Sequence, residues 1–289
     1  MTSTGSARPS AGVAPRDAAR LSHRGPFDAE WMLKFFAARA VPGVEQVAGS
    51  TYRRGVRLTH GAAVIAVDLD AQVAWRLEAG DERNAAEAAA LCRALLDLDA
   101  DAAAIDAALL RAPLLRERVA AAPGRRVPGC VDAREIAVRA VLGQQVSVAA
   151  ARTQAARLAE RCGDPLPVPC GAVTRLFPAP EALAELDPWE LPMPRARGRA
   201  LVGLAAALAA GLDARDRSQL LELPGIGPWT ADYVAMRCGD RDVLLETDLG
   251  IRRGAQALGH SGEPAALLRD AEPWRPWRSY AAQHLWSAA

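Results

Sequence analysis

Residues 221–236 read LELPGIGPWTADYVAM, and the tight turn in this stretch decides how the rest of the chain is interpreted. The turn is Pro224-Gly225-Ile226-Gly227-Pro228. Its glycines permit positive φ and the close approach of another backbone, and Pro228 suits the first position of a helix, where no N–H is needed. The helix after the turn would begin with free N–H groups that face outward, which suits an anion such as a DNA phosphate. On shape alone, a turn that merely joins two packed helices is an equal alternative.

The composition is that of an ordinary globular protein, with 51% hydrophobic and 24% charged residues in a chain of 289. This length allows two or three packed units. No apolar run approaches the roughly 20 residues of a membrane span, and the N-terminus lacks the apolar core of a signal peptide. Residues 1–24 are predicted to be a disordered tail, because they have no means of burying a core. These features favour a cytoplasmic protein with no membrane partner.

Charge and cysteine content limit the chemistry that the chain can carry. The net charge is +1, so a nucleic-acid site must be a local patch rather than the whole surface. The five cysteines are scattered and form no C-x-x-C pair, which argues against zinc, an iron–sulfur cluster and a disulfide framework. They are interpreted as small buried thiols. Of the 35 lysine and arginine residues, only Lys34 is a lysine.

The pattern of hydrophobic residues predicts an α+β protein that is mostly α. Residues 63–68 and 72–77 read as short strands at hairpin spacing, typical of an antiparallel sheet, and the alanine- and leucine-rich residues after them turn helical. From Arg111 onward nearly everything reads as helix. One helix ends at Gly143, and the next begins at Ser147, a good N-cap, and runs to Cys162. The sequence therefore predicts a small α+β unit followed by a helical body.

Several segments resemble a known family of DNA repair enzymes. The run L-P-G-I-G, followed by an aromatic residue, Thr and Ala, resembles the helix-hairpin-helix motif of the DNA glycosylase superfamily. The stretches WMLKFFAARAVPGVE, VPGCVDAREIAVRAVLGQQVSVAAA, LPMPRARGRAL and WRPWRSYAAQHLW are similar to the bacterial 3-methyladenine DNA glycosylase II, the alkylation-repair branch. The resemblance covers residues 24–288. It implies an N-terminal antiparallel sheet domain (25–111), a central helical domain with the hairpin (112–228) and a C-terminal helical domain (229–289), with the active site in the cleft between the last two.

The resemblance also implies roles for particular residues. Asp248, downstream of the hairpin, is expected in the first turn of a helix that Thr247 caps and Gly259 closes, and it is the expected catalytic carboxylate. Another carboxylate, Asp232, is expected in the first turn of the hairpin helix and is assigned no chemistry. The turn LGQQVS matches the segment where relatives insert a wedge side chain, and Gln145 is the expected wedge. The remaining expectations are a base pocket of Trp229, Tyr233 and Trp286; DNA contacts from Gln144, Gln145, Gly225, Ile226, Gly227 and Thr230; and a monovalent cation (Na or K) on the carbonyls of Leu221, Leu223 and Ile226.

This set of residues fits the excision of an alkylated base. A purine alkylated at a ring nitrogen, such as 3-methyladenine or 7-methylguanine, carries a positive charge that aromatic faces attract. Such a base leaves readily, so one carboxylate that stabilises the positive sugar could suffice. Trp229 stands where lyase-type relatives carry a lysine, which predicts a monofunctional enzyme that needs no cofactor. The expected partner is damaged duplex DNA in a bacterial nucleoid, and the expected state is a monomer. The alternatives are a bifunctional glycosylase/lyase and a non-catalytic DNA clamp that uses the hairpin alone.

Overall fold

The computed structural model describes residues 18–289. Of the predicted tail, residues 1–17 lie outside this range. Residues 19–20 form strand β1 (Ala19–Arg20), in which Ala19 pairs with Trp75 at the edge of a sheet. The prediction of disorder is therefore wrong for this end of the tail, because the short segment finds hydrogen-bond partners on an otherwise unpaired strand edge.

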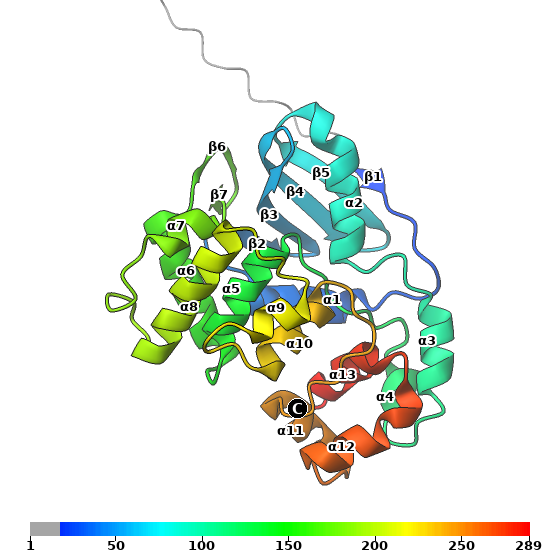
Figure 1. Cartoon of the computed structure of the whole chain (residues 1–289). Coiled ribbons are helices and arrows are strands. Elements are labelled where there is room, and N and C mark those ends of the chain that lie inside the picture. Colours follow the sequence, from blue (N-terminus) through cyan, green and yellow to red (C-terminus); the bar gives the residue numbers. More distant parts are fainter. Residues whose placement is uncertain (1–17) are drawn as a thin grey trace, which may run out of the picture.

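The N-terminal region forms the predicted antiparallel sheet, with five strands in the order β1-β5-β4-β3-β2 (Figure 1). Helix α2 lies across one face of this sheet, and helix α1 lies beneath its β2 end. Side chains of both helices, including Met32, Phe35, Phe36 and Cys92, pack against the buried face of the sheet, to which Tyr52 of the strands belongs. The elements are α1 (Ala29–Arg39), β2 (Glu45–Ala48), β3 (Thr51–Leu58), β4 (Gly61–Leu69), β5 (Val73–Ala79), η1 (Glu82–Asn84) and α2 (Ala85–Leu95).

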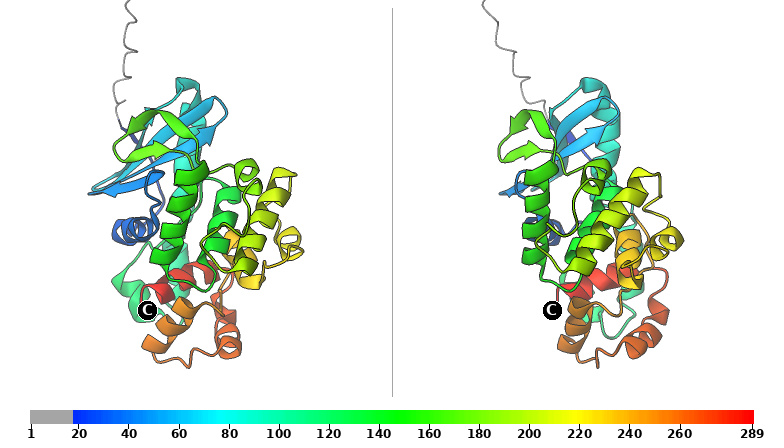
Figure 2. Two further views of the ribbon diagram at one scale, coloured as in Figure 1. Left: turned by 90° about the vertical axis from the view of Figure 1, so that its left-hand side faces the viewer. Right: turned by 60° about the vertical axis from the view of Figure 1, so that its left-hand side comes forward.

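The rest of the chain forms a helical body on the other side of α1, with α11 and α12 farthest from the sheet (Figure 2). As predicted, one helix ends at Gly143 and the next is capped by Ser147, whose side chain accepts a hydrogen bond from the N–H of Ala150. The helices are α3 (Ala102–Leu109), α4 (Arg116–Ala121), α5 (Ala133–Gly143), α6 (Val148–Cys162), α7 (Pro180–Ala184), α8 (Arg195–Ala209), α9 (Arg217–Leu221), α10 (Pro228–Arg237), α11 (Leu249–Ala257), α12 (Pro264–Asp270), η2 (Glu272–Trp274) and α13 (Arg278–Trp286).

The expectation that nearly everything after Arg111 is helical missed a hairpin of two strands, β6 (Pro165–Cys170) and β7 (Val173–Arg175). This hairpin packs against the large sheet, where the N–H of Arg175 donates to the carbonyl oxygen of Gly43 at 3.0 Å. Prolines at alternate positions of β6 leave few N–H groups for a ladder, so its sequence carries a weak strand signal.

Buried side chains also connect segments that are far apart in the sequence. Residues of α3 and α4, together with Ala100 and Val127, share one core with α11, α12 and α13. Another core joins α5, α6 and α8 to α10 and to the Pro224–Pro228 turn before it. The domain boundaries at 111/112 and 228/229 stay predictions, whereas these cores place residues 100–127 with the C-terminal helices.

A buried network of charges joins the sheet to the helical body. From β2 and β3, Glu45, Tyr52 and Arg54 face Glu135 and Arg139 of α5. Arg54 donates to Glu135 at 2.6 Å, and Arg139 donates to both Glu45 (2.9 Å) and Glu135 (3.0 Å). Burial opposes ionisation of Glu45, but the guanidinium groups of Arg139 and Arg54 outweigh it and lower the pKa of this carboxyl. The network therefore stays charged, and each partner depends on the others.

Helices α11 and α13 approach each other closely because α11 carries a glycine at the contact. A Cβ added to Gly254 would lie 1.8 Å from the carbonyl oxygen of Leu285, a distance that no side chain tolerates. Gly203, in contrast, sits in α8 with nothing within 4 Å of its added Cβ. Both glycines lie within helices, but packing requires glycine only at Gly254, so Gly203 is a suitable control.

We expect Gly254→Ala to lower the free energy of unfolding by about 3 kcal/mol or more, because α11 and α13 must separate. Gly203→Ala should raise it by about 0.5–1 kcal/mol, since alanine favours the helix and meets no neighbour. Urea unfolding of both variants checks the pair. Equal effects in the two variants would contradict the packing of α11 on α13 described here.

Candidate functional site

The hairpin has the geometry that its sequence predicts. Gly227 is the N-cap of α10 and Pro228 is its first residue. Gly225 has φ +86°, and a Cβ there would lie 2.6 Å from the Cβ of Ala200 in α8, so this position needs glycine for both reasons. The turn is closed by a hydrogen bond from the N–H of Ile226 to the carbonyl oxygen of Leu223 (3.1 Å). The N-terminus of α10 is thus held against α8.

Asp248 caps α11 itself, so the expectation that Thr247 caps this helix is wrong. Its Oδ1 accepts a hydrogen bond from the N–H of Ile251 at 3.0 Å, and Asp248 precedes the first turn rather than lying in it. Gly259 follows the end of α11, as expected. Arg252, which could have paired with Asp248 one turn on, donates instead to the carbonyl oxygen of Gly262. The carboxylate is therefore fixed at the positive end of the helix dipole.

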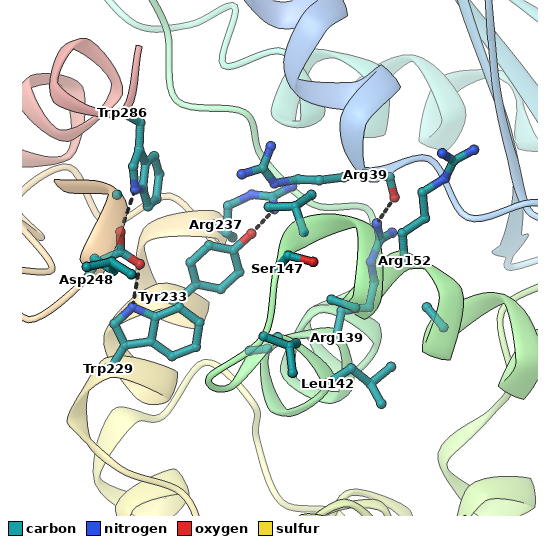
Figure 3. Close-up of a pocket in the computed structure, with 18 of the residues that line it drawn as sticks. Arg39, Arg139, Leu142, Ser147, Arg152, Trp229, Tyr233, Arg237, Asp248 and Trp286 are labelled. Carbon is teal, nitrogen blue, oxygen red and sulfur yellow. Dashed lines mark hydrogen bonds between the residues drawn. The ribbon is translucent and has the colours of Figure 1, made fainter. Parts of the chain in front are cut away.

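Two indole rings also hold this carboxylate. Trp286 Nε1–H donates to Asp248 Oδ1 at 2.8 Å, and Trp229 Nε1–H donates to Oδ2 at 2.9 Å (Figure 3). Gly250 makes room for this arrangement, because a Cβ there would lie 2.9 Å from Trp286 Cδ1 and 3.1 Å from Asp248 Oδ1. Three N–H donors thus fix the orientation of the carboxylate, and Oδ2 keeps more free acceptor capacity than Oδ1.

The predicted pocket residues come together around a cavity of about 360 Å³. Trp229, Tyr233, Asp248 and Trp286 all line it, alongside side chains of α5 and α6. Trp229 and Tyr233 are stacked, with ring centroids 5.5 Å apart, and Tyr233 meets Trp286 edge to face at 6.4 Å. In Figure 3 the carboxylate lies at the end of the pocket where Trp286 and Trp229 meet. The pocket therefore combines flat aromatic surfaces with one fixed negative charge.

Sequence reasoning missed the arginines that line the pocket, among them Arg39 and Arg237. Arg237 donates to the Tyr233 hydroxyl at 2.8 Å, and Arg39 stacks over the Phe35 ring at 3.8 Å. Burial opposes ionisation of Tyr233, but the positive charges of Arg237 and Arg39 outweigh it and lower the pKa of the phenol. The i, i+4 pairs Phe35/Arg39 and Tyr233/Arg237 were visible in the sequence, but no pattern shows that α1 and α10 face the same cavity.

The two glutamines of the α5–α6 turn have different surroundings. The Gln144 amide Nε2 donates to the carbonyl oxygen of Gly225 and to Thr230 Oγ1, both at 2.9 Å, so it ties this turn to the hairpin. Gln145 is exposed at the tip with φ +55°, a conformation that non-glycine residues rarely adopt. The side chain of Gln144 is thus occupied within the protein, whereas that of Gln145 faces outward.

Asp232, the rival carboxylate, lies elsewhere than expected. It is in the second turn of α10, beyond the reach of the dipole, and it forms an ion pair with Arg217 of α9. Its side chain therefore links the two helices of the hairpin. It is not among the residues that line the pocket.

Two other kinds of feature are absent from the described residues. Within residues 18–289, no group of three or more His, Cys, Asp and Glu side chains is arranged to hold a metal ion. Over the same range, none of the helices is long and apolar enough to cross a membrane.

His284 lies in α13, two residues before Trp286, and is fully buried. Neither of its ring nitrogens has a hydrogen-bond partner among the described residues. Burial, with smaller contributions from Arg125 and Arg118, lowers the pKa of His284 to about 3. The ring is therefore neutral in the folded protein over the physiological range.

Because the unfolded state binds a proton at His284 near pH 6.5 and the folded state does not, stability should fall as pH decreases from about 6.5 towards 3. The loss should approach about 1.4 kcal/mol per pH unit, and it is absent above pH 6.5. His284→Leu should remove this part of the pH dependence of unfolding, whereas His60→Gln, at an exposed histidine, should not. A slope that survives in His284→Leu would assign the proton uptake to another group.

The fold is that of a class of base-excision repair proteins. Residues 18–132 match the AlkA N-terminal domain, and residues 138–279 match the HhH-GPD superfamily base excision DNA repair protein. The 3-methyladenine DNA-glycosylase of Archaeoglobus fulgidus has the same fold, with a TM-score of 0.79 and 21% identity over 93% of this chain and 97% of that chain. The Clostridium acetobutylicum 8-oxoguanine glycosylase/lyase shares it at a TM-score of 0.64 and 16% identity, over 86% and 99%.

Curated relatives narrow the class. DNA-3-methyladenine glycosylase 2 of Escherichia coli is 40% identical over 281 residues, which cover 92% of this chain and 95% of that protein. A Mycobacterium tuberculosis protein, described as a probable bifunctional transcriptional activator/DNA repair enzyme AlkA, is 48% identical over 93% of this chain. This chain spans 56% of that longer relative. The chain belongs to the DNA-3-methyladenine glycosylase 2 family.

Proposed function

We propose that the protein is a monofunctional DNA glycosylase that removes alkylated, cationic purines such as 3-methyladenine and 7-methylguanine from duplex DNA. The observation that carries this proposal is the Asp248 carboxylate, held by Trp229, Trp286 and the N–H of Ile251 at the end of an aromatic pocket. A non-catalytic clamp needs the hairpin but has no use for this arrangement. Membership of the glycosylase family supports the same conclusion.

The proposed reaction begins with binding of the duplex at the hairpin. The N-terminus of α10 and the backbone of Gly225, Ile226 and Gly227 hold a phosphate, with Thr230 beside them. The damaged nucleotide turns out of the helix, and Gln145 fills the space that it leaves. Gln144 fixes the position of this turn relative to the hairpin through Gly225 and Thr230, rather than contacting DNA through its side chain.

In the pocket, the aromatic faces of Trp229, Tyr233 and Trp286 stabilise a flat cationic base by cation–π attraction. The arginines that line the pocket repel a positive charge, so the aromatic contacts must outweigh this repulsion when a cationic base binds. As the bond to the base breaks, its electron pair leaves with the base and the sugar becomes positive. Oδ2 of Asp248 faces this charge and orients the water that completes hydrolysis, leaving an abasic site.

The residue at position 229 supports a monofunctional reaction. A lyase step needs an amine that attacks the sugar, and Trp229 occupies the hairpin position where lyase-type relatives carry lysine. Lys34, the one lysine of the chain, lies in α1 and pairs with Glu30 on the surface. The shared fold cannot decide this point, since one of the similar structures is a glycosylase/lyase.

A monovalent cation would also bind at the hairpin in the proposed complex with DNA. A Na or K ion bound to the carbonyls of Leu221, Leu223 and Ile226 would bridge the hairpin and a DNA phosphate. The Leu223 carbonyl already accepts one hydrogen bond from Ile226, and its second lone pair would serve the ion. No further cofactor is needed. The proposed working state is a monomer on damaged DNA in the bacterial cytoplasm, associated with the nucleoid.

The reaction can be tested on duplex DNA that has been treated with a methylating agent. Chromatography should detect free 3-methyladenine and 7-methylguanine, and the DNA should break only after alkali or an added endonuclease. Borohydride should trap no covalent adduct. If no base is released, the non-catalytic DNA clamp is the better description of the protein. If an adduct is trapped, the protein is a bifunctional glycosylase/lyase and not a monofunctional glycosylase.

We expect Asp248→Asn to slow single-turnover excision by on the order of 10²–10³-fold, as removal of one preorganised electrostatic group does. Binding to abasic-site DNA should change little. The substitution also disturbs the hydrogen bonds. If the asparagine oxygen keeps the two bonds of Oδ1, its NH₂ group faces the Nε1–H of Trp229, so that a donor meets a donor. The double variant Trp229→Phe/Asp248→Asn removes that conflict, and it should be equally slow if the lost charge is the cause.

Asp232→Asn is the matched control. It removes a carboxylate from α10 outside the pocket, and it breaks only the ion pair with Arg217. Excision should stay within about tenfold of the parent protein, since ion pairs near the surface contribute about 1 kcal/mol or less. A dead Asp232→Asn beside an active Asp248→Asn would overturn the catalytic assignment.

A further inference from the structure

Two cysteines far apart in the sequence meet behind the wall of the pocket. Cys130 lies just before α5, and Cys238 is the C-cap residue of α10, 108 residues later. Their Sγ atoms are 3.7 Å apart and share a hydrogen bond. The cysteines are scattered in the sequence, but the fold brings these two together.

The surroundings of this pair differ from those of the other three cysteines. Cys130 and Cys238 line a cavity of about 270 Å³, and neither residue is fully buried. The charged residues of this cavity are four arginines and three aspartates: Arg93, Arg215, Arg237, Arg241, Asp97, Asp99 and Asp240. This cavity is separate from the one that Asp248 faces. A small oxidant can thus reach the sulfurs without entering the site described above.

The two thiols are not equivalent. The hydrogen bond with Cys130 lowers the pKa of the Cys238 thiol despite burial, and the positive charges of Arg215 and Arg237 lower it further. The same bond, together with burial, raises the pKa of Cys130. Burial raises the pKa of Cys92, Cys162 and Cys170, so Cys238 alone among the five has the environment of a reactive thiolate.

We propose that Cys130 and Cys238 are a reversible redox site that closes to a disulfide when it meets a hydroperoxide. The Cys238 thiolate attacks one oxygen of the peroxide, the O–O bond breaks, and a sulfenic acid forms as water or an alcohol leaves. The Cys130 sulfur then attacks the Cys238 sulfur, the S–S bond forms, and the sulfenic oxygen leaves as water. The two thiols lose two electrons in total, and the peroxide gains them.

Arg237 shows why closure would leave the neighbouring pocket intact. Its Nε donates to the carbonyl oxygen of Pro128 at 2.6 Å and its Nη2 to that of Gly129 at 2.7 Å, so the end of α10 already rests on the segment that carries Cys130. Closure therefore needs movement of the two side chains and little movement of the backbone. The hydrogen bond from Arg237 to Tyr233 would persist, and excision should stay within about twofold of the reduced protein.

The experiment treats the full chain with hydrogen peroxide at neutral pH and follows free thiols, peptides and stability. Thiols should fall from five to three and return with dithiothreitol, and peptide mapping should find Cys130 joined to Cys238. The midpoint of thermal unfolding should rise by about 5 °C or more, because the new bond closes a loop of more than a hundred residues. Five remaining thiols, a bond to another cysteine or an unchanged midpoint would each overturn the proposal.

Single variants test the order of events. Cys130→Ser should leave a sulfenic acid on Cys238 that dimedone labels, whereas Cys238→Ser should give no label on Cys130. Cys162→Ser, at a thiol that donates to the Leu158 carbonyl, is the matched control and should still form the disulfide. Equal labelling of Cys130 and Cys238 would overturn the assignment of the attacking sulfur. The peptide map of the parent protein decides the pairing even if a serine variant folds poorly.

Discussion

The carboxylate of Asp248 is the point at which three separate parts of the chain meet. It accepts hydrogen bonds from the first turn of its own helix, from the hairpin helix through Trp229 and from the last helix through Trp286. A half-buried negative charge loses part of its hydration, and these three donors compensate for that loss. The same bonds orient both indole rings. The carboxylate and the aromatic rings therefore depend on each other. The indoles hold the charge that the proposed chemistry needs, and the charge orients the rings that would receive the base.

Small residues set how closely these parts can meet. Gly250 leaves room for the Trp286 ring beside the carboxylate, and Gly254 lets α13 rest on α11. On the other side of the hairpin, Gly225 rests on Ala200 of α8. None of these glycines carries a functional group. Their contribution is the short distance between helices, which in turn places Trp286 and the N-terminus of α10.

The sequence predicted the elements better than it predicted their contacts. Local signals were sufficient for the sheet, for the break at Gly143 and for Pro228 at the start of α10, because propensity and capping act over a few residues. The resemblance brought Asp248, Trp229, Tyr233 and Trp286 together, and the geometry agrees. Three features depend on helix packing, which no local pattern encodes. They are the bonds from both indoles to the carboxylate, the arginines that line the pocket and the pairing of Cys130 with Cys238. The hairpin of β6 and β7 was missed because prolines hide its strand character.

The buried charges between the sheet and α5 have a consequence for how the protein can be divided. Arg139 lies in α5 and lines the pocket, yet it is neutralised partly by Glu45 of β2. A helical fragment without the sheet would keep the Arg139–Glu135 pair within α5 but lose Glu45 and Arg54, which surround that pair in the whole protein. The remaining pair would meet water where the sheet had covered it, and α5, the helix that carries the Gln144 turn, would lose its contacts with the sheet. The sheet therefore cannot be removed without affecting the pocket. It supplies Glu45 and Arg54 to the buried ion pairs, and Arg139, the partner of Glu45 in α5, lines the pocket.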